Sequence, residues 1–196
     1  MVPPLPSAAP QPSALAKLID ANPAPPTSSH QSHLHYLALQ IAHNLRYQHN
    51  WTDVRLHFNA QDSDNVFPRP LITGLPPQRL YVHPDEQIAL LQRQKDEGKT
   101  GMPEVHPERE WVLPTHLREK WSLRRFGEVF DKVSLVPTAD GGKGLFGEQV
   151  NGHLANGQAK VNEWRTTKRV LLATLDDDST VVYYIVHDGI VKPRQN

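Results

Sequence analysis

The chain has 196 residues, which is enough for one domain with a hydrophobic core and for additional terminal or loop segments. Its 21 Lys and Arg residues balance 21 Asp and Glu residues, so no overall charge draws it to nucleic acid or membranes, and any RNA contact has to be local. The absence of cysteine excludes disulfides, iron–sulfur clusters and thiolate zinc sites. No apolar run in the sequence approaches the length of a membrane span.

Proline, glycine and small residues divide the chain into regions. Residues 1–27 are rich in Pro and Ala, which predicts a disordered tail. Residues 28–196 then form one predicted domain. Within it, two segments at about 95–107 and 138–158 are rich in glycine, proline or polar residues, and we expect them to be flexible insertions.

Hydrophobic spacing predicts the first ordered elements. The stripe of an amphipathic helix is formed by Leu34, Leu37, Ala38, Ile41, Ala42 and Leu45. Alternation over Asp53–Asn59 predicts a half-buried strand, and Pro70–Gly74 and Arg79–His83 give two further short extended runs. Pro84 opens a second predicted helix, in which Ile88 and Leu91 are apolar positions.

The second half of the domain continues in the same mixed pattern. Glu110–Leu113 is a predicted short strand that Pro114 stops, and Ser122 is a good N-cap for a following helix. Its expected apolar positions are Leu123, Phe126, Phe130 and Val133. The chain then ends in a predicted β-hairpin. The fold class is therefore α+β, with a mixed, largely antiparallel sheet that is flanked by helices.

The terminal hairpin is the most informative feature. Asp176, Asp177 and Asp178 form an acidic turn, and both faces of the following strand, Thr180–Val186, are apolar. This pattern predicts a strand covered on both sides and indicates docking to a partner protein. Since Tyr183 and Tyr184 point to opposite faces, one can serve the chain's own core and the other the partner.

We expect the partner-facing set to be Val182, Tyr184 and Val186, with Tyr183 in the chain's own core. A bulge in the strand would exchange the two faces.

The sequence offers little for catalysis or cofactor binding. Its 11 histidines include no H-E-x-x-H pattern, so we predict no metal site. There is no G-x-S-x-G motif, and the glycines at 141–144 lack the spacing of a phosphate-binding loop. We therefore assign no cofactor and no catalytic residue.

A metal-independent ribonuclease remains as an alternative. Such an enzyme needs a base, an acid and a cation around the scissile phosphate, for example His, Tyr and Lys. His83 beside Tyr81 and His187 near Lys192 are the local candidates, and both histidines equally suit the ends of strands.

The densest basic cluster consists of Arg118, Lys120, Arg124 and Arg125. A solvated helix face is its default interpretation, and contact with an RNA backbone or an acidic loop of a partner is the alternative.

Three segments together resemble a known family. They are the W-T-D-V segment at Trp51–Val54, the W-V-L-P-T run at Trp111–Thr115 that leads to Trp121 and a helix, and the ending Asp177–Tyr184 with Asp188 and Gly189. These segments are similar to the small structural subunit of the eukaryotic tRNA-splicing endonuclease, the Sen-fifteen type. The resemblance covers Leu34–Asn196 apart from the two insertions, and the D-S-T-x-V-Y-Y ending is its most specific part.

The resemblance implies a tRNA-intron-endonuclease-like fold and a non-catalytic role. The family implies a heterotetramer of two catalytic and two non-catalytic subunits that excises introns from precursor tRNA, in the nucleus or on the cytosolic face of mitochondria. Each non-catalytic subunit would pair with a catalytic one through its last strand, here Thr180–Val186. An acidic loop, here Asp176–Asp178, would dock into a basic cleft of a neighbouring subunit. The alternatives are a stand-alone ribonuclease and a homodimeric RNA-binding module that pairs through the same strand.

Overall fold

The computed structural model describes residues 11–25, 31–59, 66–101, 103, 105–138, 141–147 and 162–191. Parts of the predicted tail (residues 1–10 and 26–27) and of the two predicted insertions (residues 102, 104, 139–140 and 148–158) lie outside the described residues.

A mixed sheet forms the centre of the fold, with the strand order β4-β1-β2-β3-β5-β6. Its strands are β1 Thr52–Asn59, β2 Val66–Leu75, β3 Glu110–His116, β4 Lys143–Gly144, β5 Arg169–Leu175 and β6 Val181–His187. β3 and β5 run parallel and in step, while the other neighbouring strands are antiparallel. The predicted α+β class, with a largely antiparallel sheet that ends in a β-hairpin, is confirmed.

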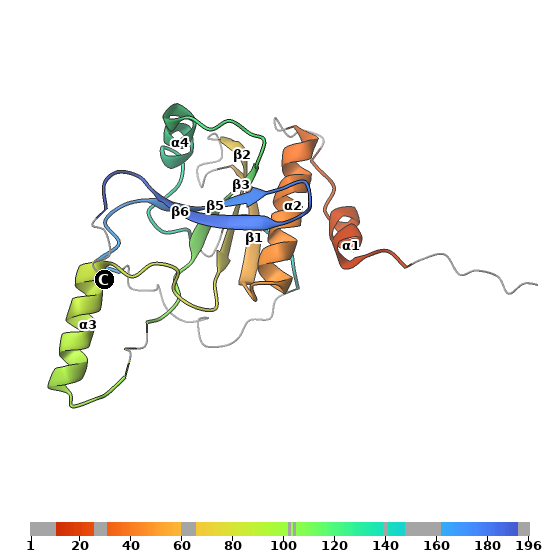
Figure 1. The fold of residues 1–196 in the computed structure, drawn as a ribbon. Helices are drawn as coiled ribbons and strands as arrows, with labels where there is room; N and C mark the ends of the chain where they lie inside the picture. Colours follow the sequence, from red (N-terminus) through yellow and green to blue (C-terminus); the bar gives the residue numbers. More distant parts are fainter. Residues whose placement is uncertain are drawn as a thin grey trace, which may run out of the picture.

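Helices lie on both sides of this sheet (Figure 1). They are α1 Ala14–Ala21, α2 Ser32–Tyr47, α3 Pro84–Asp96 and α4 Leu123–Phe130. α2 packs on one face, in a core that includes Val112 and Leu171, and α4 packs on the other, in a core that includes Leu113 and Val170. Successive residues of β3 and β5 thus alternate between two cores, because strand side chains alternate between faces. α3 projects from the body of the domain (Figure 1).

The prediction of a disordered tail is wrong for residues 14–21, which form α1. The Ser13 side chain caps this helix by accepting a hydrogen bond from the backbone N–H of Ala16. Leu18 is buried against the core on the α2 side, and the His35 ring bonds to the backbone oxygen of Asn22 just after the helix. The Pro- and Ala-rich composition alone did not predict this helix, which is stabilised by the Ser13 cap and by the burial of Leu18.

Two strand predictions also need correction. The run at Pro70–Gly74 belongs to the longer strand β2, whereas Arg79–His83 forms no strand. β3 does not stop at Pro114 but continues to His116. The ladder of β3 with β2 covers Glu110–Val112, while its ladder with β5 extends to His116. A proline without an N–H is therefore tolerated where β3 is paired along one side only.

Three of the apolar positions predicted for α3 and α4 are exposed and do not contribute to the core. Ile88 is 64% exposed, Leu91 41% and Leu123 91%. In α3, only Pro84 and Glu86 are buried, so this helix is attached to the domain through its first turn.

The prediction of a flexible insertion is wrong for residues 141–147. β4 adds to the free edge of β1, the Leu145 N–H donates to the Val54 oxygen, and the Leu145 side chain is buried. Gly142 has φ +78° and lies so close to the His57 ring that an added Cβ would come within 2.6 Å of it. Burial under this segment, with Arg109 and Arg55 nearby, lowers the pKa of His57 to about 4. The segment thus closes the β1 edge of the sheet.

We expect Leu145→Ala to lower the free energy of unfolding by ~2 kcal/mol, because it removes buried apolar contacts at the sheet edge. Lys143→Ala is the matched control on the same segment, since Lys143 is exposed and should change stability by less than ~0.5 kcal/mol. Urea denaturation of both variants measures this. Equal stability of the two variants would show that the segment does not support the fold.

Candidate functional site

The turn of the terminal hairpin is held by its own backbone. The Asp176 N–H donates to the Thr180 oxygen at 2.9 Å, and the Ser179 N–H donates to the Asp176 oxygen at 3.0 Å. Ser179 has φ 69°, in the left-handed region that non-glycine residues seldom adopt. The turn therefore presents its acidic side chains from a defined backbone.

Each carboxylate of the acidic turn already has a partner. Asp178 accepts from the Thr180 N–H at 2.8 Å, and this bond holds the pKa of Asp178 below its usual range. Asp176 accepts from the Asp177 N–H at 2.7 Å. Asp177 pairs with the Arg118 guanidinium, and its Oδ1 lies 3.3 Å from His116 Nε2. Repulsion among the three charges is thus offset within the chain itself.

Strand β6 lies at the edge of the sheet and is only partly covered. Among the described residues it pairs with β5 alone. Val182 is 43% exposed and Tyr184 59%, whereas Val186 packs against the core on the α4 side. The prediction of a strand covered on both faces is therefore wrong for the single chain, because the face of β6 that carries Val182 and Tyr184 is open to solvent.

Tyr183 is on the opposite face of β6 from Tyr184. It packs against the core on the α2 side, and its hydroxyl donates to Asn44 Oδ1 at 2.6 Å. Burial raises the pKa of Tyr183. The structure thus places Tyr183 in the chain's own core and leaves Tyr184 free for another contact.

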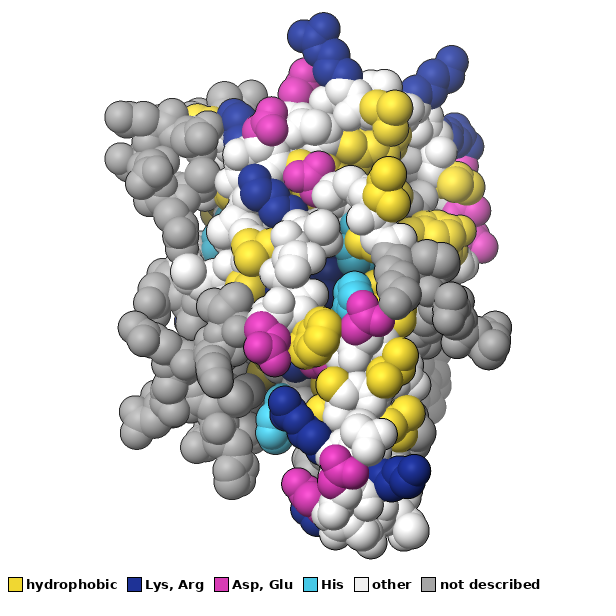
Figure 2. Space-filling model, turned by 90° about the vertical axis from the view of Figure 1, so that its left-hand side faces the viewer, with side chains coloured by type: hydrophobic (Ala, Val, Ile, Leu, Met, Phe, Trp, Pro, Cys, Tyr) yellow, Lys and Arg dark blue, Asp and Glu magenta, His cyan; other side chains and the backbone are white. Residues whose placement is uncertain are grey.

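The basic cluster at α4 is largely balanced by acidic neighbours. Arg118 pairs with Asp177, Arg124 pairs with Glu128 at 3.2 Å, and Arg125 pairs with Glu119 at 3.5 Å. Arg125 also lies over the Trp121 ring, 4.5 Å from its centroid, while Lys120 is exposed. On the face in Figure 2, basic and acidic side chains are interspersed and form no continuous basic field.

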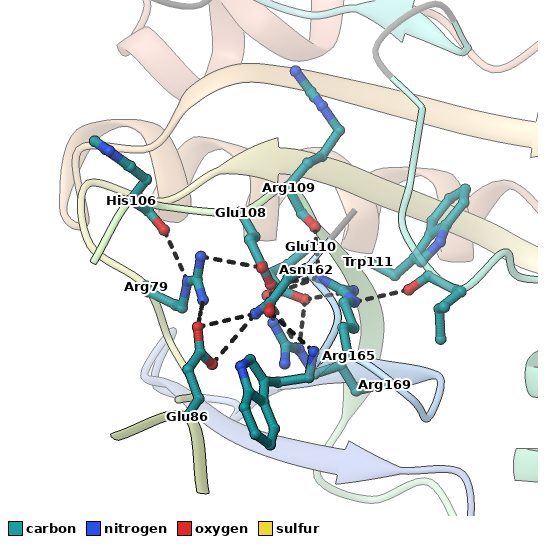
Figure 3. Close-up of polar contacts among 12 residues, drawn as sticks. Arg79, Glu86, His106, Glu108, Arg109, Glu110, Trp111, Asn162, Arg165 and Arg169 are labelled. Carbon is teal, nitrogen blue, oxygen red and sulfur yellow. Dashed lines mark hydrogen bonds and ion pairs between the residues drawn. The ribbon is translucent and has the colours of Figure 1, made fainter. Parts of the chain in front are cut away.

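A buried ion network lies beneath the start of β3 and β5 (Figure 3). Glu110 is 2% exposed and accepts from Arg165 Nη2 at 3.0 Å and from Arg169 Nε at 3.1 Å. Glu108 also pairs with both arginines. Arg79 links Glu108 to Glu86 in the first turn of α3, at 3.2 and 2.6 Å.

Sequence reasoning missed this network. The two arginines are 55 and 59 residues from Glu110, and no short motif joins them. A buried charge is tolerated only when it is paired. Because Glu110 is buried, we assign the network a structural role.

The ribonuclease candidates take up other roles. The Tyr81 ring contacts the His187 ring, with centroids 4.8 Å apart, but the nearby Arg169 is held by Glu108 and Glu110. Burial, together with Arg169 and Arg165, lowers the pKa of His187. His83 instead accepts from the Asp85 N–H as the N-cap of α3. Lys192 lies outside the described residues.

Neither a metal cluster nor a membrane-spanning helix occurs in the part of the chain that the structure describes. No three His, Asp or Glu side chains gather there as a group that could hold a metal ion. No helix there is long and apolar enough to cross a membrane.

Comparison with known proteins places these features in a family. The model of the Sen15 protein family matches residues 40–143 and 148–196, which include the whole terminal hairpin. The chain belongs to this family. It is 48% identical over 171 residues to the probable tRNA-splicing endonuclease subunit tsp-1 of Neurospora crassa, covering 86% of this chain and 69% of that relative. It is 26% identical over 156 residues to the probable tRNA-splicing endonuclease subunit sen15 of Schizosaccharomyces pombe, covering 78% of each protein. The Sen15 match thus includes both the edge strand and the ion network.

We expect Glu110→Gln to lower the free energy of unfolding by about 3 kcal/mol, the lower end of the cost of breaking a buried ion pair, because it leaves two buried guanidinium groups with Glu108 as their remaining shared carboxylate. Glu128→Gln is the matched control, since the Glu128–Arg124 pair is exposed and worth ~0.5 kcal/mol or less. Chemical denaturation compares the two. A Glu110→Gln variant as stable as the control would contradict the role assigned to the network.

Proposed function

We propose that this chain is a non-catalytic structural subunit of a tRNA-splicing endonuclease and that it holds a catalytic subunit in place for intron excision from precursor tRNA. The observation that carries the proposal is the Sen15 family match, together with two relatives that are named as subunits of this endonuclease. The geometry adds a candidate means of assembly, which is an uncovered edge strand beside a fixed acidic turn.

The edge strand suits pairing with a second protein. An edge strand offers unpaired backbone N–H and C=O groups to another chain. On β6 these groups lie beside Val182 and Tyr184, which are both exposed. A partner strand that pairs with β6 would extend the sheet and bury both side chains. A heterotetramer would form if the partner in turn binds further subunits of the endonuclease.

The same geometry argues against intrinsic cleavage. A ribonuclease site needs a cation free to bind the scissile phosphate, but Arg169 beside Tyr81 and His187 is committed to two glutamates. The Tyr81 hydroxyl is buried and has no hydrogen-bond partner among the described residues. A buried hydroxyl cannot reach an RNA backbone, which favours the structural role.

The purified chain alone should therefore leave precursor tRNA uncut. In a complex reconstituted with catalytic subunits, His187→Gln should assemble and cut at the rate of the unaltered complex. Gel analysis of cleavage, beside size-exclusion analysis of assembly, measures both. Cleavage by the isolated chain, or loss of cleavage in a fully assembled His187→Gln complex, would sink the proposal of a non-catalytic subunit.

Tyr184→Ala should weaken association with the catalytic partner by about 30-fold, the effect of a ~2 kcal/mol interface hot spot, and leave the free chain folded. Tyr47→Ala is the matched control, because Tyr47 on α2 is 61% exposed and contacts His43 and Phe146 away from β6. Tyr183→Ala should mainly destabilise the free chain. Binding titration and circular dichroism separate these effects. Equal affinity of the Tyr184 and Tyr47 variants would place the partner elsewhere.

A further inference from the structure

Residues 141–147 lie as a strap over the β1 edge of the sheet, and a short attachment holds them there. The β4 ladder joins only two residues of the strap to β1. The Leu145 N–H also donates to the Val54 oxygen, and the side chains of Leu145 and Phe146 pack against the core on the α2 side. On its other side β1 is held by its longer ladder with β2. The strap can therefore leave the edge while the rest of the sheet stays paired.

The strap lies directly on the ring of a buried histidine. His57 is 6% exposed, and its Nε2 lies 2.8 Å from the Thr73 hydroxyl oxygen. A Cβ added at Gly141 would come within 3.2 Å of this ring, and one added at Gly142 within 2.6 Å. Two successive glycines thus let the backbone approach the imidazole more closely than other residue types would allow. Removal of the strap would uncover the ring.

A proton on this ring is unfavourable while the strap is closed. Burial disfavours the imidazolium, and Arg109 and Arg55 add like charge, so the pKa of His57 is lowered to about 4 from its ordinary value of 6.5. Burial raises the pKa of Asp53, but its pairs with the same two arginines outweigh burial and hold that pKa below its usual range. The groups that the ring meets on β2 and β3, a threonine hydroxyl and the Trp111 indole, carry no charge.

We propose that residues 141–147 are a pH-gated strap: a neutral His57 keeps the strap closed over β1, and a proton on His57 releases it. After release β1 is a second open edge of the sheet, with backbone groups free to pair with another chain. Closure thus restricts the chain to strand pairing at β6. This device lies at the opposite edge of the sheet from β6 and does not rest on the proposed function.

The direction of the pH effect follows from the proton affinities of the closed and open forms. The open form binds the proton more tightly, so closure is strongest above the ordinary pKa of histidine and is lost as the pH falls toward the lowered pKa of His57. Because Arg55 and Arg109 stay near the ring in the open form, opening relieves only the part of the shift that burial causes. We expect the open fraction to rise about tenfold between pH 7 and pH 5.

Amide exchange of the ¹⁵N-labelled full chain, measured by NMR at pH 7 and pH 5 and corrected for intrinsic exchange rates, tests the proposal. The Leu145 amide should lose about tenfold in protection at pH 5, while the amides of the β3–β5 ladder keep theirs. His57→Gln should remove this pH dependence, because the glutamine amide can still bond to Thr73 but does not titrate. His33→Gln is the matched control, since His33 is exposed on α2, and it should leave the pH dependence intact.

Gly142→Ala should open the strap without a proton, because the added Cβ would meet the His57 ring. Protection of the Leu145 amide should then be low at both pH values, and NMR titration of the His57 ring should give a higher pKa than in the unaltered chain. Gly98→Ala is the matched control. Its φ of +66° also disfavours a side chain, but an added Cβ there has nothing within 4 Å, so it should leave the strap closed.

Three results would each overturn the proposal. The first is equal protection of the Leu145 amide at pH 7 and pH 5 in the unaltered chain. The second is a pH dependence in His57→Gln as large as in His33→Gln. The third is loss of protection in the β3–β5 ladder together with the strap, which would indicate global unfolding. If Gly142→Ala fails to fold, the comparison of the two histidine variants decides alone.

Discussion

The arrangement of the sheet depends on one buried carboxylate. Glu110 stands at the start of β3, and two arginines reach it, Arg165 from the segment before β5 and Arg169 from the first residue of β5. This contact ties the beginnings of two parallel strands that are far apart in the sequence. Because β3 and β5 run in step to His116 and Leu175, it also brings the β3–α4 connection beside the hairpin turn. The Arg118–Asp177 contact is a consequence of that register.

The two edges of the sheet differ in how far they are covered. The β1 edge is closed by the short strand β4, by Leu145 in the core and by glycines over His57. The β6 edge has no such cover among the described residues and exposes Val182 and Tyr184. Proteins generally protect edge strands against chance pairing. A sheet with one covered edge and one open edge suits a subunit that pairs its strand with a single partner.

Local patterns predicted much of the fold, while long-range contacts were beyond them. The spacing from Leu34 to Leu45 and the alternation over Asp53–Asn59 predicted α2 and β1, because these elements bury one regular face. The same spacing rule predicted Ile88 as an apolar position of α3, but Ile88 is exposed because α3 projects from the domain and its apolar side has no surface to pack against. The Glu110 network and the meeting of Tyr81 with His187 join distant segments, and no spacing rule encodes them. Strict alternation predicted that Tyr183 and Tyr184 lie on opposite faces of β6, but which face meets the core depends on packing against α2.

We propose that β6 and its acidic turn form the assembly surface of a structural subunit. Hydrogen–deuterium exchange of the chain, free and in a reconstituted endonuclease, would locate this surface. Amides of β6 and of the turn at Asp176–Ser179 should become strongly protected in the complex, while those of β4 at the opposite edge should exchange as before. Unchanged exchange along β6 in a complex that assembles fully, with new protection elsewhere, would show that the partner binds another surface.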